Sequence, residues 1–454
     1  MQKQSVTSFE EAENYINGIP RFSSKNTMED TKAFLHRLGD PDRRMRIIHV
    51  AGTNGKGSVC AYMSSVLQAA GYRVALFTSP HLVDIRERFM VDGEMISKEE
   101  FLRAFLQVYR LLEFPEAGDE GAGPEPASDP GARPLFYHPS YFEYLFFMAM
   151  VIFPEKQPDF CILETGLGGR LDATNSVSRK ELAVITHISL DHVEYLGDTA
   201  EKIAGEKACI MQAGAPAVYW DTCESVSRVF EQKGLELGVK THPVSKKDYR
   251  FLGFANKSID FSLHTGYYSY ITLTLHTIAA YQMENAALAV RALETLDGGR
   301  TITEDQIRRG MEGCFWAGRM EEVLPEVFVD GAHNEDGVRA FLETVAEDRH
   351  TGPRALLFSV VKDKDYGRMV EELERSGLFD RIFAAHMRTG RAVSPERLRE
   401  LFDQYPGCRY EVYDNVSTAF CELLHSRRQD ERIYIAGSLY LAGEIKELLK
   451  DDKF

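Results

Sequence analysis

The chain has 454 residues, which is too long for one ordinary hydrophobic core and predicts two or three domains. Its composition, 44% hydrophobic and 27% charged, is that of a soluble globular protein. The net charge of −16 argues against a general binder of nucleic acid or anionic membranes, because both need a basic surface. A local cluster of lysine, arginine or metal could still hold an anionic small substrate.

The seven cysteines are scattered and include no C-x-x-C pair, which argues against a zinc site or a disulfide framework and favours reduced thiols. The N-terminal sequence MQKQSVTSFEEAENYI lacks the apolar core of a signal peptide. The longest apolar run, YFEYLFFMAMVIFP, is shorter than the ~20 residues that a membrane span needs, so we expect a buried helix. These features predict a cytoplasmic protein.

Short apolar runs alternate with longer periodic segments in the first two thirds of the chain. Runs typical of strands buried on both faces lie at 46–51, 72–78, 159–164, 182–188 and 215–220. Helices are predicted at 57–70, 141–153, 199–211 and 224–237. This alternation favours a doubly wound α/β domain with a mainly parallel sheet. Residues 249–277 alternate with period two and predict antiparallel strands appended to that sheet.

A second alternation begins after Trp316 and predicts a smaller α/β domain. Its strand-like runs lie at 326–330, 354–360, 381–387, 410–414 and 432–438. We therefore expect domains at 1–312 and 316–454, although the predicted helix at 303–312 could belong to either side. Residues 113–134 are rich in proline, glycine and acids and cannot bury enough apolar surface to fold. We expect a mobile surface loop there, with a motif for a partner as the alternative.

The sequence GTNGKGS at 52–58 lies between a predicted strand and a predicted helix, which is the context of a phosphate-binding loop. Backbone N–H groups of such a turn can hold phosphate oxygens, while Lys56 can contact the β- and γ-phosphates and Ser58 can ligate Mg²⁺. The spacing departs from the common pattern G-x-x-x-x-G-K-[ST], because Val50 replaces the first glycine and Gly57 follows the lysine. A glycine-rich turn with a solvated lysine is the alternative.

Two further side chains could complete a metal site beside this loop. Glu164 ends the buried run FCILE, and a buried carboxylate has to be paired or bound to metal. The next predicted strand leads to Asp191 and His192. Ligands bind at the carboxyl ends of parallel strands, so we expect Glu164 and His192 to lie near Ser58. A hydrogen-bonded structural histidine is the alternative for His192.

Seven segments together resemble folylpolyglutamate synthases and dihydrofolate synthases, which belong to the Mur ligase superfamily of ATP-dependent amide-forming enzymes. In chain order they are HVAGTNGKGS, TSPHL, ETGLGGRLDATN, ISLDH, GEKACIM, WAGRMEE and VDGAHN. The resemblance implies a P-loop-containing Mur-ligase-like ATPase domain followed by a smaller Rossmann-like α/β domain with the glutamate-ligase chemistry. In that superfamily the phosphate loop reads G-T-[NK]-G-K-[GT]-[ST], so the loop here is intact.

The resemblance also implies a nucleotide and metal site in the first domain. The residues implied to bind ATP phosphates are Gly52, Thr53, Asn54, Gly55, Lys56, Gly57 and Ser58. Asn285 would contact adenine, and Tyr281 stands where the family commonly has histidine. Ser58, Glu164 and His192 would hold one Mg²⁺. Lys207, once carbamylated, would hold a second, although Gly205 and Cys209 depart from the family there and a helix-surface lysine is the alternative. A monovalent cation is a further candidate.

The second domain would supply the remaining catalytic residues. Arg319 would reach the ATP phosphates, while Asp330 and His333 would face the glutamate and the γ-phosphate. With Lys56 and Lys207 they form the catalytic set that the resemblance implies. Asp365 matches a motif whose role is less defined. Ser438 and Tyr440 lie at a last strand–helix junction and receive no role.

The resemblance places a folate-like substrate on another part of the first domain. The residues implied to contact it are Thr78, Ser79, Pro80, His81, Arg88, Phe142 and Asp172. Arg86 is an alternative to Arg88 for an anionic tail. A carboxylate such as that of Asp172 suits a pterin, because it can accept two N–H donors of the aminopyrimidine edge. A helix N-cap is the alternative for Asp172.

These residues imply a ligase that uses ATP, L-glutamate and either dihydropteroate or a reduced folate. A substrate carboxylate would attack the γ-phosphate to give an acyl phosphate, which the amine of glutamate would then displace. The two domains would have to close for catalysis. We favour a bifunctional enzyme, with extension of the glutamate tail alone as the next alternative. A P-loop kinase or ATPase and a non-catalytic nucleotide-binding protein are more distant alternatives. The family implies a monomer.

Overall fold

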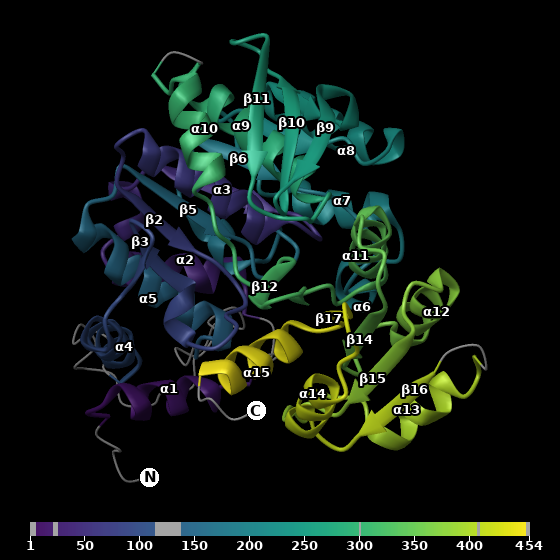
Figure 1. The fold of residues 1–454 in the computed structure, drawn as a ribbon. Helices are drawn as coiled ribbons and strands as arrows, with labels where there is room; N and C mark the ends of the chain where they lie inside the picture. Colours follow the sequence, from purple (N-terminus) through teal and green to yellow (C-terminus); the bar gives the residue numbers. More distant parts are fainter. Residues whose placement is uncertain (1–5, 21–25, 114–137, 299–300, 406–408, 451–454) are drawn as a thin grey trace.

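The computed structural model describes residues 6–20, 26–113, 138–298, 301–405 and 409–450, which form two α/β bodies (Figure 1). None of the helices within these ranges is long and apolar enough to cross a membrane. The predicted loop at 113–134 falls outside the described ranges, except for Glu113, which is the last residue of helix α4 (Lys98–Glu113).

The first body is built on an eight-stranded sheet with the order β4-β3-β2-β5-β1-β6-β7-β8. Its strands are β1 (Ile47–Ala51), β2 (Val74–Phe77), β3 (Phe89–Val91), β4 (Glu94–Met95), β5 (Phe160–Glu164), β6 (Leu182–Ile185), β7 (Ala217–Trp220) and β8 (Thr241–Val244). The six strands β2, β5, β1, β6, β7 and β8 pair in parallel in that order, and β3 and β4 add an antiparallel edge beside β2. The predicted mainly parallel sheet is confirmed. The three short strands β3, β4 and β8 were not predicted from the sequence.

Helices cover both faces of this sheet because successive strand residues point in opposite directions. Ile48 and Val50 share one core with α3 (Lys56–Ala69), α9 (Gln282–Asp297) and α10 (Glu304–Glu312). Ile47 lies in the core of the opposite face, with α1 (Phe9–Asn17), α2 (Met28–Arg37), α4 and α5 (Tyr141–Lys156). Helices α6 (Val193–Leu196), α7 (Ala200–Ala208) and α8 (Glu224–Leu237) contribute to a core beside β6 and β7. The expected buried helix is confirmed as α5. Short 3₁₀ helices occur at Pro41–Arg44, Ile85–Arg88, Ala173–Ser176 and Lys246–Asp248.

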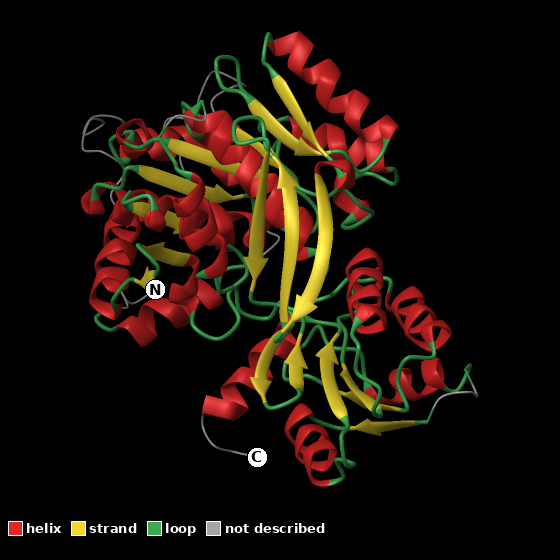
Figure 2. Ribbon diagram, turned by 45° about the horizontal axis from the view of Figure 1, so that its top comes forward, coloured by secondary structure: helices red, strands yellow, loops and turns green. Residues whose placement is uncertain are grey.

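The antiparallel strands predicted within 249–277 are present, but their predicted attachment to the first sheet is wrong. They are β9 (Tyr249–Ala255), β10 (Ser258–His264) and β11 (Tyr270–Leu275), and they form a separate sheet with the order β11-β10-β9. Their alternate apolar residues, such as Ile259 and Phe261, belong to the core that contains α3 and α9. The sheet therefore packs through its face rather than extending an edge, and it reaches toward the second body (Figure 2).

The second body contains a six-stranded sheet with the order β12-β13-β17-β14-β15-β16. Its strands are β12 (Glu321–Leu324), β13 (Val327–Val329), β14 (Arg354–Phe358), β15 (Arg381–Ala385), β16 (Tyr410–Tyr413) and β17 (Arg432–Ala436). One face packs on α11 (Glu335–Glu347), α12 (Tyr366–Ser376) and α13 (Pro395–Phe402), and the other on α14 (Val416–His425) and α15 (Leu439–Lys450). The five predicted strands are confirmed. The unpredicted β12 pairs antiparallel with β13.

Helix α10 shares the core of the first body. A Cβ atom on Gly310 would lie 2.4 Å from the Cα of Val66 in α3, so the two helices approach closely because this residue is glycine. Trp316, four residues beyond α10, packs on the same core, and its ring lies 3.0 Å from where a Cβ of Gly57 would be. The boundaries at 312 and 316 stay a prediction.

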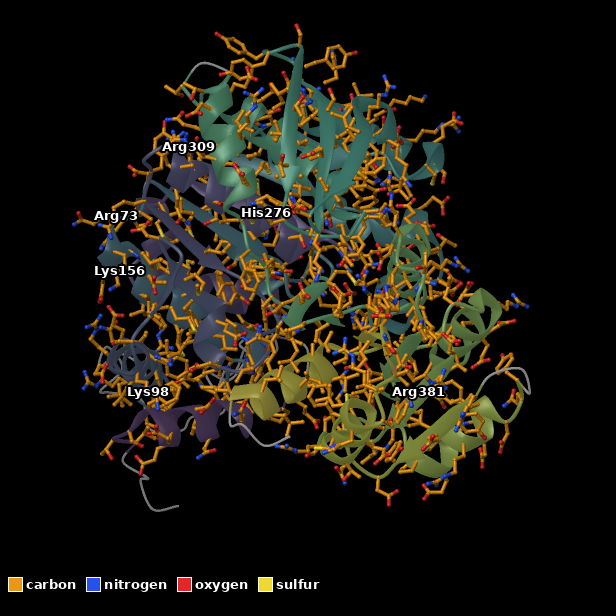
Figure 3. All side chains as sticks on the ribbon, in the orientation of Figure 1. Arg73, Lys98, Lys156, His276, Arg309 and Arg381 are labelled. Atoms are coloured by element: carbon orange, nitrogen blue, oxygen red, sulfur yellow. The ribbon has the colours of Figure 1, made fainter. Side chains whose placement is uncertain are left out.

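Basic side chains are spread over the molecule and meet carboxylates locally. Each of the six residues labelled in Figure 3 has an acidic partner within 4 Å: Arg73–Asp92, Lys98–Glu10, Lys156–Glu100, His276–Glu312, Arg309–Asp305 and Arg381–Glu431. Of these, only the Arg381 pair is buried. Because the net charge is negative, a site for an anion must be formed locally, by loops that bring positive side chains or backbone N–H groups together.

Candidate active site

Four neighbouring strands of the first sheet end at one edge, and predicted site residues lie at or directly after the ends of three of them. Strand β1 leads into the loop 52–55, and its neighbour β5 ends on Glu164. Strand β2, on the other side of β5, leads to Thr78 and Ser79. Strand β6, the other neighbour of β1, leads to Thr186. The sheet order β2-β5-β1-β6 therefore gathers these side chains at the edge where parallel sheets bind ligands.

The phosphate-loop segment turns tightly, and two of its glycines are required by close approaches. A Cβ on Gly52 would lie 1.7 Å from Oγ1 of Thr186, whose hydroxyl donates to the carbonyl of Asn54 at 2.6 Å. Gly55 precedes helix α3 with φ +85, and a Cβ there would lie 2.2 Å from Oδ1 of Asn285. The backbone is therefore wrapped against β6 and α9, with the start of α3 directed at the pocket.

Lys56 and Lys207 converge on this loop from two helices. The Nζ of Lys56 donates to the carbonyls of Gly52 at 3.2 Å and Thr53 at 3.1 Å. The Nζ of Lys207 donates to the same carbonyl of Gly52 at 2.7 Å and is 3% exposed as a residue. Burial, and then the charge of Lys56, lower the pKa of Lys207 to about 7. The alternative of a helix-surface lysine at Lys207 is wrong.

Glu164 and Ser58 supply the oxygen atoms of the predicted metal site. Glu164 is 3% exposed, and its carboxylate accepts from the backbone N–H of Ser79 at 2.9 Å. Burial raises the pKa of this carboxyl, although the charges of Lys56 and Arg319 oppose the shift. The Oγ of Ser58 accepts from the side-chain amide of Gln282 at 3.2 Å. Within the described ranges, three or more His, Cys, Asp or Glu side chains nowhere gather closely enough to hold a metal.

This donor set still fits Mg²⁺, because that ion keeps several waters and commonly takes only one or two protein oxygens together with phosphates. His192 does not lie directly at the strand end. It lies seven residues beyond the end of β6, and its Nε2 is 3.4 Å from Nζ of Lys364 and 3.9 Å from Oδ1 of Asp191. Burial lowers the pKa of His192 to about 4. Its role as a metal ligand stays a prediction.

The second body presents Asp330 and His333 on the turn after β13. The Asp330 carboxylate accepts from the hydroxyl of Tyr281 at 2.5 Å and from the backbone N–H of Met320 and Ala332 at 3.0 and 2.8 Å. It therefore shapes the turn and joins it to the first body. The Nδ1 of His333 lies 2.8 Å from the carbonyl of Gly331. Nδ1 must then carry the proton, which leaves Nε2 as an acceptor in the neutral ring. Burial lowers the pKa of His333 to about 3, which favours that neutral form.

A pocket of about 590 Å³ lies between the two bodies. It is lined by seven of the predicted site residues: Asn54, Gly55, Ser58, Asn285, Arg319, Asp330 and His333. Four of them come from the first body and three from the chain after Trp316. Four of the predicted nucleotide residues and three predicted second-domain residues thus meet in one cavity, which is large enough for a bound small molecule.

The predicted folate residues lie beyond this pocket, near β2 and β5. The Nε of Arg88 donates to Nδ1 of His81 at 2.9 Å, and Pro80 follows a cis peptide bond. The ring of Phe142 lies 2.7 Å from where a Cβ of Gly166 would be. Asp172 is 5% exposed and caps the 3₁₀ helix Ala173–Ser176 by accepting from the backbone N–H of Thr174 at 3.0 Å. The N-cap alternative is therefore present, and contact of Asp172 with a pterin stays a prediction. Arg86 is paired with Asp84.

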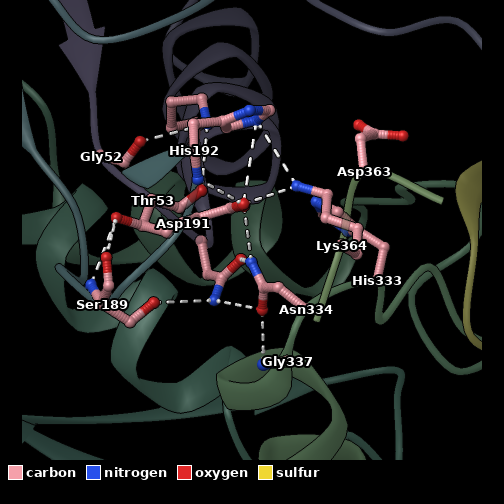
Figure 4. Close-up of polar contacts among 12 residues, drawn as sticks. Gly52, Thr53, Ser189, Asp191, His192, His333, Asn334, Gly337, Asp363 and Lys364 are labelled. Carbon is pink, nitrogen blue, oxygen red and sulfur yellow. Dashed lines mark hydrogen bonds and ion pairs between the residues drawn. The ribbon is translucent and has the colours of Figure 1, made fainter. Parts of the chain in front are cut away.

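A polar network that was not predicted from the sequence joins the two bodies (Figure 4). Asn334 and Lys364 of the second body both contact the Asp191 carboxylate, and Asn334 also exchanges hydrogen bonds with Asn54 of the phosphate loop. Asp363, the neighbour of Lys364, has no contact drawn to this group. Asn334 carried one local signal, because an Asn followed by two acids is typical of a helix N-cap. No signal in the sequence indicated that the segments containing Asn54, Asp191 and Asn334 would meet.

Comparison with known proteins shows that the chain is similar to Mur ligases. Residues 142–293 match the Mur ligase middle domain, and residues 318–439 match the Mur ligase glutamate ligase domain. The dihydrofolate synthase/folylpolyglutamate synthase of Bacillus subtilis is 32% identical over 98% of this chain and all of its own length. The structure of Escherichia coli FolC in complex with DHPP and ADP superposes with a TM-score of 0.83 at 26% identity, over all of both chains. Mycobacterium tuberculosis folylpolyglutamate synthase complexed with ADP gives 0.84 at 28% identity, over 97% of this chain and 98% of that one.

Proposed function

Because the chain belongs to the dihydrofolate synthase/folylpolyglutamate synthase family of Mur ligases, we propose that it joins L-glutamate to dihydropteroate and to the glutamate tail of reduced folates. It is an ATP-dependent ligase of an acid and an amino acid. The observation that carries the proposal is the pocket between the bodies, where Asn54, Ser58 and Asn285 face Arg319 and His333. A kinase or simple ATPase would need only the first half of that pocket.

The first body would bind ATP through the loop 52–58. Lys56 and the backbone N–H groups at the start of α3 would hold the phosphates, and Asn285 would lie against the base. Ser58 and Glu164, with His192, would hold Mg²⁺, which supplies neutralisation of charge on the transferred phosphoryl group. The raised pKa of Glu164 supports this role, because a buried carboxylate gains most from a cation beside it. A side chain larger than that of glycine would clash with Thr186 at position 52 and with Asn285 at position 55.

Lys207 would serve as a second metal-binding group after carbamylation. Carbamylation needs a neutral amine, which attacks CO₂ and releases a proton as the N–C bond forms. With a pKa of about 7, Lys207 supplies the neutral amine at physiological pH, where an ordinary lysine would be almost fully protonated. Its Nζ already lies 2.7 Å from a phosphate-loop carbonyl, so a carbamate there would face the bound phosphates.

Ligation would proceed in two steps across the pocket. The acceptor carboxylate would attack the γ-phosphate, with Lys56 and Arg319 neutralising the charge of the transferred group, to give an acyl phosphate and ADP. The amine of glutamate would then attack the acyl carbon and release phosphate. Since Nε2 of the neutral His333 is a hydrogen-bond acceptor, it can orient that amine. Both halves of the pocket come from one chain, which supports a monomeric enzyme.

The bifunctional activity is tested by two parallel reactions of the purified protein, one with dihydropteroate and one with tetrahydrofolate, each with ATP, Mg²⁺ and labelled glutamate. We expect a labelled product from both acceptors. Label in tetrahydrofolate products alone would restrict the enzyme to tail extension. The Bacillus subtilis relative is named for both activities, which favours the bifunctional form here.

A further inference from the structure

A buried ion pair crosses from the second body to the first beside the pocket. The Nζ of Lys364, on the loop between β14 and α12, lies 2.6 Å from Oδ1 of Asp191, on the loop between β6 and α6. The side chains are 7% and 9% exposed, respectively. A charge with so little access to water is costly when its partner is absent, so the pair strongly favours arrangements of the two bodies in which both partners meet.

The same carboxylate holds the second body at another point. Oδ2 of Asp191 accepts from Nδ2 of Asn334 at 2.9 Å, and Asn334 is the N-cap of α11, where its Oδ1 accepts from Gly337 at 2.8 Å. Asn334 also exchanges side-chain hydrogen bonds of 3.1 and 3.2 Å with Asn54. The side chain of Asn54 is thus turned toward the second body, and a further hydrogen bond of 2.9 Å joins it to Asp336.

We propose that Lys364 and Asn334 are positioning residues of the ligase, which fix the second body over the phosphate loop through their joint hold on Asp191. His333 immediately precedes Asn334, so the placement of Asn334 sets where the imidazole faces the pocket. Lys364 fixes a second, separate loop, and two attachment points on one carboxylate resist rotation as well as separation. The effect of these contacts to Asp191 on catalysis rests on the proposed function, whereas their effect on domain placement does not.

The chain offers a matched control in a second ion-pair contact between the bodies. Lys257, at the turn between β9 and β10, pairs with Glu322 at 2.6 Å and Glu326 at 2.8 Å. These side chains are 42%, 32% and 34% exposed, so solvent can replace the contact at little cost. Lys257→Met therefore removes an interdomain lysine pair of the same chemical type without touching the pocket.

The test compares Lys364→Met, Lys364→Arg, Asn334→Asp and Lys257→Met in the full chain. Asn334→Asp keeps the N-cap acceptor but replaces the Nδ2 donor by a carboxylate oxygen facing Asp191. We expect Lys364→Met and Asn334→Asp to lower kcat about 100-fold while the Kd for a non-hydrolysable ATP analogue changes at most about threefold. Lys364→Arg should recover kcat to within about tenfold of the parent. The kcat of Lys257→Met should stay within about twofold of the parent value.

Domain placement is read separately by single-molecule energy transfer between dyes on α8 and α13, with the ATP analogue alone. The distance distribution should widen in Lys364→Met and Asn334→Asp but stay unchanged in Lys257→Met. Equal losses in Lys364→Met and Lys257→Met, or an unchanged distribution in Lys364→Met, would overturn the proposal. A parent protein that forms no glutamylated product would instead defeat the proposed function, because the energy-transfer result needs neither acceptor nor glutamate.

Discussion

The two halves of the pocket are built in different ways. In the first body, four adjacent strand ends and the start of α3 place the phosphate loop and Glu164 at one edge of the sheet, and Lys207 reaches the same loop from α7. In the second body, Arg319 and His333 lie on segments whose position over the pocket depends on contacts between bodies. Nucleotide binding should therefore depend on the fold of one body, whereas transfer should depend on the placement of the other.

The largest effect is expected from the first half. Lys56→Ala removes the side chain that we propose neutralises the β- and γ-phosphates, so kcat/KM should fall about 1000-fold and the Kd for ATP should rise at least about tenfold. Steady-state kinetics and calorimetric titration measure both quantities. The circular dichroism spectrum should stay that of the parent, because Lys56 contacts only two loop carbonyls. Full activity in this variant would remove Lys56 from the site.

A smaller and more selective effect is expected from the second half. His333→Ala removes the acceptor Nε2 but leaves the phosphate loop intact, so kcat should fall about 100-fold while the Kd for ATP changes at most about threefold. The contrast with Lys56→Ala is the informative result. If His333→Ala weakened ATP binding as much as it slowed turnover, the division of labour between the halves would be wrong.

We expect Lys207 to make the first half sensitive to pH and CO₂. With a pKa of about 7, its amine is mostly protonated at pH 6 and mostly neutral at pH 8, and only the neutral amine forms a carbamate. Activity of bicarbonate-depleted protein should rise on adding bicarbonate at pH 8, by about tenfold more than at pH 6. A carbamate signal in the NMR spectrum with ¹³C-labelled bicarbonate provides the direct readout. Lys207→Met should lose both the signal and the response to bicarbonate.

The smallest loss of activity is expected from removing one hydrogen bond between the two halves, the bond from Tyr281 to Asp330. Tyr281→Phe removes the hydroxyl that donates to Asp330 at 2.5 Å but keeps the ring. Asp330 retains two backbone donors, so we expect a loss in kcat of about fivefold, in line with one lost hydrogen bond. Stopped-flow comparison with the parent resolves this difference. A loss as large as that of His333→Ala would mean that Tyr281 itself takes part in transfer.

Local patterns predicted much of this molecule. Buried apolar runs and a glycine-rich turn identified β1, the phosphate loop and α3, because a strand, a turn and a helix in succession are specified by neighbouring residues. The position of Glu164 at a strand end likewise follows from its own segment. The predicted extension of the first sheet by residues 249–277 was wrong, because period-two alternation specifies a strand and its buried face but not the partner on which that face packs.

Contacts between distant segments could not be predicted in this way. Asp191 and Lys364 are 173 residues apart, and neither lies in a pattern that indicates the other. The N-cap role of Asn334 was readable from the sequence, but its bonds to Asn54 and Asp191 depend on how the bodies are placed. For the same reason the sequence indicated His192 as a strand-end ligand, whereas the structure places it on a later loop beside Lys364.

We propose that one pocket couples ATP cleavage to the joining of glutamate and a folate-type acid. The most direct measurement follows ADP and glutamylated product together by mass spectrometry, with dihydropteroate and L-glutamate present, singly omitted or both omitted. We expect one ADP for each product formed and almost no ADP when either substrate is left out. ADP formed at the full rate without glutamate would contradict it and would indicate a kinase or ATPase.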